Sequence, residues 1–80
     1  MTSETSNFEF LVEYISARVT EWLARDEGLE VAQAMLRFHN SETFEILSRP
    51  ETGMYIESPA FVYEIFREES RKGTLRGLTE

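Results

Sequence analysis

Catalytic chemistry in this sequence would have to begin at its one histidine, because the chain contains no cysteine. His39 could act as a general base only with an orienting carboxylate and a nucleophile held beside it. Asn40, Ser41 and Glu42 carry suitable atoms, but neighbours in sequence need not meet in space. We interpret His39 instead as a helix-terminal residue favoured by the helix dipole, or as a polar residue in a joint between helices. We therefore expect no catalytic residue and no enzyme activity.

The acidic side chains are numerous enough that pairs at helical spacing arise by chance. Glu9 and Glu13 lie one helical turn apart, and so do Glu64 and Glu68. Di-metal sites in helical bundles need two Glu-x-x-His motifs, which one histidine cannot supply. The oxygen-rich residues 48–57 lack the alternating ligands of a calcium loop. We expect solvated acidic faces, no metal site, and no cofactor, because the four separate glycines form no phosphate-binding loop.

Length and charge narrow the class of protein. Eighty residues make one domain, and eight Lys and Arg against fifteen Asp and Glu give a net charge of −7. Residues 1–69 hold five Arg and fourteen acids, giving −9, whereas residues 70–80 hold three bases and one acid, giving +2. The acidic body disfavours phosphate backbones, so nucleic acid is not an expected partner, and weak binding through the basic tail is the minor alternative.

The chain also lacks the marks of a membrane or secreted protein. No run of about 18 apolar residues is present that could span a bilayer, and the polar, acidic residues 1–7 do not resemble a signal peptide. We expect a cytoplasmic protein with no membrane partner. A chain this short buries only about 60–65% of its unfolded surface, which leaves little room for a deep cavity.

The spacing of apolar residues predicts an all-α protein. Ser6 and Glu9 have the spacing of a capping box at the start of the first helix, and Gly28 suits the left-handed position after its end. We expect a compact bundle of four helices over about residues 7–26, 29–39, 41–48 and 59–72. They form a single helical domain, residues 1–72, followed by a mobile tail, residues 73–80.

The second and third helices leave alternatives open. The second is apolar around most of its circumference, which predicts a place in the middle of the bundle or under another chain. Asn40 or Ser41 caps the third helix, whose first turn is acidic. Around the turn at 49–53, residues 43–48 and 54–58 could instead form a hairpin. Helix is the preferred interpretation because the cap supports it and an isolated two-stranded hairpin is only marginally stable.

The fourth helix has the clearest start in the chain. Ser58 is a favourable N-cap, and Pro59 at the first helical position loses an amide that had no partner anyway. Its expected inward stripe, with Tyr63 at the edge, is Phe61, Val62, Ile65 and Phe66.

The chain has more large apolar residues than so small a domain is expected to bury. Ten of its eighty residues are aromatic, and the connector before the fourth helix contains Met, Tyr and Ile where polar residues are usual. Either all of them pack into one core, or some form a surface for another chain, because Trp and Tyr are enriched among interface anchors. The candidate interaction residues are Trp22, Glu51, Thr52, Gly53, Met54, Tyr55 and Tyr63.

Three segments carry distinctive motifs: Glu30-Val-Ala-Gln-Ala-Met-Leu, Asn40-Ser-Glu-Thr-Phe-Glu-Ile-Leu and Glu51-Thr-Gly-Met-Tyr-Ile-Glu-Ser-Pro-Ala-Phe-Val-Tyr-Glu. They contain a Ser-Glu-Thr-aromatic block, a Glu-Thr-Gly-x-Tyr turn and a Ser-Pro-x-aromatic helix start, within roughly residues 8–69. In these features the chain resembles a family of small uncharacterised bacterial helical proteins, a domain of unknown function. Such proteins occur in gene clusters with other small domains, some near ADP-ribosyltransferase-like toxin candidates. The resemblance therefore implies an antitoxin-like or accessory role.

Two functions of different classes follow from these patterns. The first is a non-enzymatic protein-interaction module that binds a basic partner, because an acidic body steers association toward a cationic surface. The alternative is a small helical homodimer with a structural or regulatory role, with the wide apolar face of the first or second helix as its seam.

Overall fold

Four α-helices and two short 3₁₀ helices make up the protein. A computed structural model describes residues 3–73, and the side chains from residue 7 on. The elements are α1 (Ser3–Glu27), α2 (Val31–His39), α3 (Glu42–Leu47), η1 (Pro50–Thr52), η2 (Met54–Ile56) and α4 (Pro59–Lys72). Residues 3–73 contain no strand, so the all-α prediction with four helices is confirmed and the hairpin alternative is wrong. The predicted mobile tail, apart from Gly73, lies outside the described residues.

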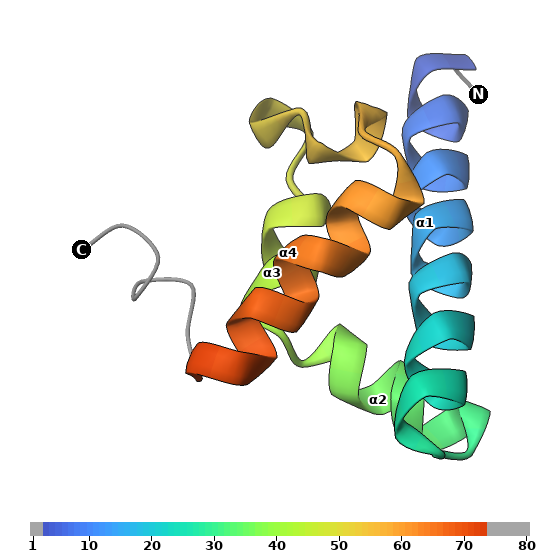
Figure 1. Cartoon of the computed structure of the whole chain (residues 1–80). Helices are drawn as coiled ribbons and strands as arrows, with labels where there is room; N and C mark the ends of the chain where they lie inside the picture. Colours follow the sequence, from blue (N-terminus) through green and yellow to red (C-terminus); the bar gives the residue numbers. More distant parts are fainter. Residues whose placement is uncertain (1–2, 74–80) are drawn as a thin grey trace.

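The long helix α1 stands along one side of the molecule, and α2, α4 and η2 pack against it (Figure 1). The helix α2 turns back at the C-terminal end of α1, α4 crosses the middle, and α3 packs against α4. The helix η2 reaches α1 near its N-terminal half. Among the described residues, no helix is both long enough and apolar enough to cross a membrane.

Both ends of α1 follow from local sequence, although only one was predicted correctly. The helix begins at Ser3, so the prediction of a start at residue 7 with Ser6 as the N-cap is wrong. Residues 3–6 contain no glycine or proline that would stop the helix. At the other end Gly28 has a φ of 66°, and Leu29 N–H donates to the Ala24 carbonyl at 2.9 Å. This Schellman arrangement confirms the predicted glycine stop.

The helix α2 lies at the surface, so its predicted place in the middle of the bundle is wrong. It begins at Val31, after Glu30, whose N–H donates to Gln33 Oε1 at 3.2 Å. Only Ala34 and Phe38 are buried. Its exposed apolar residues are Val31 (58% exposed), Met35 (44%) and Leu36 (65%). The helix α1 covers one face of α2, and the next helix, α3, has only six residues and is too short to cover the other.

The short helix α3 is held at its N-terminus by two side chains. Ser41 Oγ accepts from Phe44 N–H at 3.1 Å, as the predicted cap should. The second is the carboxylate of Glu69 on α4, which accepts from Glu42 N–H at 2.8 Å, Thr43 N–H at 2.9 Å and Thr43 Oγ1 at 2.8 Å. This carboxylate therefore satisfies amides that a helix leaves without partners.

The helix α4 closes the core. Its predicted bounds are confirmed, with Ser58 Oγ accepting from Phe61 N–H at 3.1 Å. Two side chains differ from the prediction, because Phe61 is 45% exposed while Tyr63 is buried. The inward stripe of α4 therefore consists of Val62, Tyr63 and Phe66. The buried core comprises Ile15, Val19, Leu23, Ala34, Phe38, Leu47, Val62, Tyr63 and Phe66.

A fully buried phenylalanine lies at the centre of the aromatic packing. Phe38 meets Phe44 of α3 with ring centroids 5.6 Å apart and Phe66 of α4 with centroids 5.4 Å apart. Both pairs are edge-to-face, the arrangement that the charge distribution of aromatic rings favours. One side chain of α2 thus joins the two helices that follow it.

Candidate protein-binding groove

An open groove of about 660 Å³ runs between α1, α2 and α3. Its volume is in the range of ligand sites, but it is a surface groove rather than an enclosed pocket. The residues that line it are Phe8, Glu9, Val12, Glu13, Ser16, Ala17, Thr20, Met35, His39, Phe44 and Ser48. This hollow therefore lies at the surface, between helices.

The wall formed by α1 consists of two rows of residues, each at four-residue steps. The inner row, Phe8, Val12, Ser16 and Thr20, passes from partly buried to buried along the helix. The outer row, Glu9, Glu13 and Ala17, is exposed. Residues four apart lie above one another on a helix, so the groove has an inner floor and an acidic rim.

The opposite wall is aromatic and aliphatic. Met35 and His39 lie one turn apart on α2, and the His39 ring packs edge-to-face on Phe44 with centroids 4.5 Å apart. His39 is the last residue of α2, as the helix-terminal interpretation predicts. Across the described residues, no cluster of three or more His, Asp or Glu could hold a metal ion. The groove therefore presents apolar surface and hydrogen-bonding groups.

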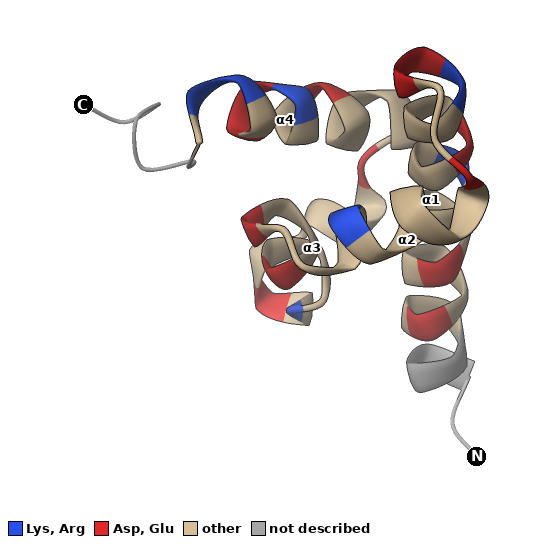
Figure 2. Ribbon diagram, turned by 90° about the horizontal axis from the view of Figure 1, so that it is seen from below, with Lys and Arg blue, Asp and Glu red and all other residues tan. Residues whose placement is uncertain are grey.

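The rim of the groove carries the negative charges of Glu9 and Glu13. The first basic residue of the chain is Arg18, so all charged side chains in the N-terminal half of α1 are acidic. Figure 2 shows them as red bands on α1, with further acidic residues on α3. Glu9 and Glu13 form no ion pair within residues 3–73. The ion pairs lie elsewhere: Arg18–Glu21, Arg25–Asp26, Arg37–Glu27, Arg49–Glu45 and Arg71–Glu68.

One buried hydroxyl in the groove has no hydrogen-bond partner. Ser16 is 8% exposed, and its Oγ is unbonded within the described part of the chain. Buried polar groups are almost always hydrogen-bonded, since leaving one unpaired costs about 1–3 kcal/mol. Ser48, which lines the same groove, differs because its hydroxyl donates to the Phe44 carbonyl at 2.9 Å. The inner row therefore holds an unused donor and acceptor.

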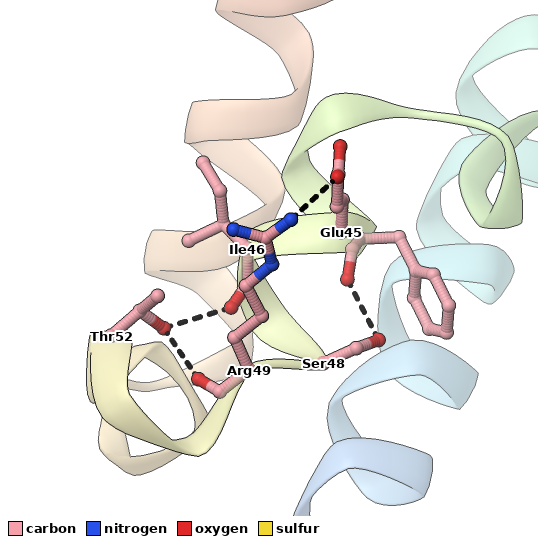
Figure 3. Close-up of polar contacts among 6 residues, drawn as sticks. Glu45, Ile46, Ser48, Arg49 and Thr52 are labelled. Carbon is pink, nitrogen blue, oxygen red and sulfur yellow. Dashed lines mark hydrogen bonds and ion pairs between the residues drawn. The ribbon is translucent and has the colours of Figure 1, made fainter.

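The far end of the groove is fixed by polar contacts at the end of α3 (Figure 3). The Arg49 guanidinium pairs with Glu45 at 2.9 Å across one turn, beside the Ser48–Phe44 hydrogen bond. A second hollow of about 470 Å³ continues from His39 and Phe44 past these residues. Of these contacts, the hydrogen bond from Ser48 reaches Phe44, through its backbone carbonyl.

The predicted contact turn at residues 51–54 folds back on α3. Thr52 Oγ1 lies 2.8 Å from the Ile46 carbonyl and 2.9 Å from the Arg49 carbonyl, and its hydroxyl donates to these acceptors. Gly53 has a φ of 74°, which links η1 to η2 and disfavours a side chain. Glu51 is exposed and Met54 is partly buried against the core. In this structure the turn closes the C-terminus of α3.

Tyr55 supports the groove from behind. Its ring meets Phe8 edge-to-face with centroids 4.9 Å apart, and it is partly buried against the core. Phe8 in turn lines the groove. Of the predicted contact residues, Tyr55 is thus joined to the groove through a ring that forms its wall.

Trp22 and Tyr63 lie together at the interface of α1 and α4, and neither lines the groove. Their ring centroids are 5.6 Å apart, and the Tyr63 hydroxyl donates to Asp26 at 2.7 Å. Arg18 lies over Trp22 and Arg67 over Tyr63, at 5.2 and 5.8 Å from the ring centroids. The structure therefore brings these two predicted residues together, apart from the turn at 51–54.

The contact between Tyr63 and Asp26 changes the acidity of both groups. Burial, and then the hydrogen bond to the Asp26 carboxylate, raise the pKa of Tyr63 to about 12. The hydrogen bond from Tyr63, followed by the one from Arg25, lowers the pKa of Asp26 below its usual value. The pair is thus held as a neutral phenol on a carboxylate.

Sequence reasoning did not identify the groove. The spacing of Glu9 and Glu13 predicts a solvated face, and both residues are exposed in the structure. It does not predict the inner row of groove residues beside them. The available signal was Ser16 and Thr20, two polar residues that interrupt the apolar stripe one turn apart. Such an interruption indicates either a hydrogen-bonded core contact or a wall open to a partner.

A comparison with protein-family models finds no match for this chain, and comparisons with curated proteins and with solved structures find none either. The resemblance to small bacterial helical proteins, with its implied antitoxin-like role, therefore stays a prediction.

Proposed function

We propose that this protein is a non-enzymatic protein-interaction module that binds a basic partner in the groove between α1, α2 and α3. The observation that carries the proposal is apolar groove surface, formed by Phe8, Val12 and Met35, beside the carboxylates of Glu9 and Glu13, which form no ion pair within residues 3–73. Apolar contact supplies affinity, and an acidic rim selects a cationic partner and speeds its approach. The antitoxin-like or accessory role and the cytoplasmic location belong to this proposal as predictions.

The test uses two synthetic helical peptides with the same amphipathic pattern, one of leucine and lysine and one of leucine and glutamate. The lysine peptide should shift the amide resonances of isotope-labelled protein along the groove, and its binding should weaken with added salt. The glutamate peptide should leave them unchanged. Shifts that gather on the outer face of α4 instead would contradict the proposed site.

A pair of matched substitutions locates the binding surface. Ala17 is exposed on the groove rim, whereas Ala60 is exposed on α4 outside the groove. We expect Ala17→Arg to weaken binding of the lysine peptide at least about tenfold, because it adds bulk and positive charge beside the carboxylates. Ala60→Arg should have little effect. Equal weakening by both would indicate attraction to the whole acidic surface rather than to the groove.

The homodimer alternative has an observation of its own. Phe10 and Tyr14 are 66% and 48% exposed on α1, and their rings are stacked with centroids 6.4 Å apart. Sedimentation analysis tests it: a stable dimer that Phe10→Glu dissociates would favour the alternative. A protein that sediments as a monomer over a wide concentration range would count against it.

A further inference from the structure

We infer that the partner presents to the groove an amphipathic basic α-helix with one polar residue inside its apolar stripe, placed to bond Ser16. This inference rests on the proposed function and adds the form of the partner and one specific contact. Its three supports are the shape of the groove, the spacing of the rim charges and the buried hydroxyl.

The groove suits a helix better than an extended segment. An extended peptide must find partners for its backbone amides, usually at a sheet edge, whereas a helix satisfies its own. Residues 3–73 contain no strand that could offer such an edge. The α1 wall runs from Phe8 to Thr20, which at about 1.5 Å per residue is roughly 18 Å, or three turns of a partner helix.

The rim predicts the charges of that helix. Glu9 and Glu13 are one turn apart on the exposed row, so their carboxylates can meet Lys or Arg residues that are also one turn apart. The opposite wall, with Met35 and Phe44, faces the same space with apolar side chains. A helix that is apolar on one face and basic at the border of that face is complementary to both walls.

The hydroxyl of Ser16 adds a demand that an all-aliphatic stripe would not meet. Ser16 lies in the inner row, between Val12 and Thr20 at four-residue steps, and lines the groove. Its Oγ is buried and unbonded within residues 3–73, so a partner group reaches it only after rotation about the Cα–Cβ bond turns it toward the groove. A partner amide or hydroxyl at this point would make a hydrogen bond screened from water, which fixes the register of the two helices.

The experiment is a coupling measurement with a series of leucine–lysine helical peptides. One peptide has an uninterrupted leucine stripe, and each of the others carries a single asparagine at a different stripe position. All are titrated by fluorescence anisotropy against the full chain and against Ser16→Ala. We expect one asparagine position at which Ser16→Ala weakens binding about fivefold, while it leaves the all-leucine peptide as tight or tighter.

The control is Ser48→Ala, which removes a hydroxyl in the same groove that already donates to the Phe44 carbonyl. It should show coupling of less than about twofold with every peptide. If no asparagine position couples to Ser16 while the lysine peptides still bind and remain sensitive to Ala17→Arg, the inference is wrong and the proposed function stands. If no lysine peptide binds, or all ignore Ala17→Arg, the proposed function itself fails.

Discussion

The two sides of α1 differ in whether their polar and charged side chains have partners within the described residues. On the side toward α4, Trp22 packs on Tyr63, and the Tyr63 hydroxyl donates a hydrogen bond to the Asp26 carboxylate at 2.7 Å. On the side toward α2 and α3, Ser16 has no partner in the described chain, and the carboxylates of Glu9 and Glu13 have no cation.

This difference separates residues that stabilise the domain from residues that are free to bind. The presence of aromatic residues in a sequence does not reveal which of these two classes they belong to. Trp22 and Tyr63, for example, pack against each other between α1 and α4. Unsatisfied polar groups beside apolar surface are the more informative sign, since folding alone does not account for them. The predictions below separate the two sides, from the largest expected effect to the smallest.

Substitution of Phe38 should destabilise both the groove wall and the packing against α4. Phe38 is fully buried and joins Phe44 on the groove wall to Phe66 on α4. We expect Phe38→Ala to lower the free energy of unfolding by about 3–5 kcal/mol, most of the stability of so small a domain. Urea denaturation followed by circular dichroism measures this.

The exposed Phe61 is the matched control for Phe38. Phe61→Ala removes the same side chain from the surface and should lower the free energy of unfolding by less than about 1 kcal/mol. Similar losses for the two variants would show that the assigned centre of the core is wrong.

Removal of the carboxylate that caps α3 should damage the groove wall while leaving the interface of α1 and α4 in place. We expect Glu69→Ala to lower the free energy of unfolding by about 1–3 kcal/mol, because two amides and the Thr43 hydroxyl lose their acceptor. Hydrogen exchange should become faster at the start of α3 than in α1. The neighbouring Glu68, which pairs with Arg71 at the surface, is the control, and Glu68→Ala should not change exchange in α3.

The interface of α1 and α4, where Tyr63 contacts Asp26, should lose stability at alkaline pH. The pKa of Tyr63 is raised from 10.0 to about 12, so the native state prefers the neutral phenol. This preference stabilises the fold fully below pH 10, and the contribution is lost as pH rises from 10 toward about 12. Tyrosinate absorbance should show a group that ionises near pH 12 in the native protein, and Tyr63→Phe should remove it.

Two substitutions sharpen this result. Tyr63→Phe should lower the free energy of unfolding by about 1–2 kcal/mol at neutral pH, since its hydrogen bond goes to a charged carboxylate. Asp26→Asn should lower the pKa of Tyr63, because the charge that opposes ionisation is gone. An unchanged titration in Asp26→Asn would leave burial as the sole cause.

The smallest effect on stability is expected for Ser16, the groove residue whose hydroxyl has no hydrogen-bond partner within the described residues. Ser16→Ala should leave the free energy of unfolding within about 0.5 kcal/mol or raise it, because the hydroxyl that it removes has no partner. Thr43→Val removes a buried hydroxyl of similar size that donates to Glu69, and should cost about 1–2 kcal/mol. Thermal denaturation of the two variants side by side compares them. A larger loss for Ser16→Ala would assign that hydroxyl to the core.

The sequence predicted the elements whose start and stop signals are local. Ser58 and Pro59 begin α4, Gly28 ends α1, and Ser41 caps α3, each through atoms within a few residues. The start of α1 differs from the prediction because the capping-box spacing of Ser6 and Glu9 falls inside the longer helix.

The features that the sequence could not predict depend on contacts between distant residues. Glu69 acts on α3 across 26 and 27 residues, and Tyr63 is buried by the way α4 crosses α1. The exposure of α2 and the groove beneath it follow from the shortness of α3, which leaves part of α1 uncovered. A helical pattern gives the apolar face of each element but not which neighbour covers it.

The cap from Glu69 also sets an order of events during synthesis. A helix of six residues is well below the length of about 12–15 residues at which isolated helices become even marginally stable in water. The carboxylate that holds α3 emerges from the ribosome 26 residues after Thr43. We therefore expect a nascent chain to complete the Phe44 wall only once α4 has been made.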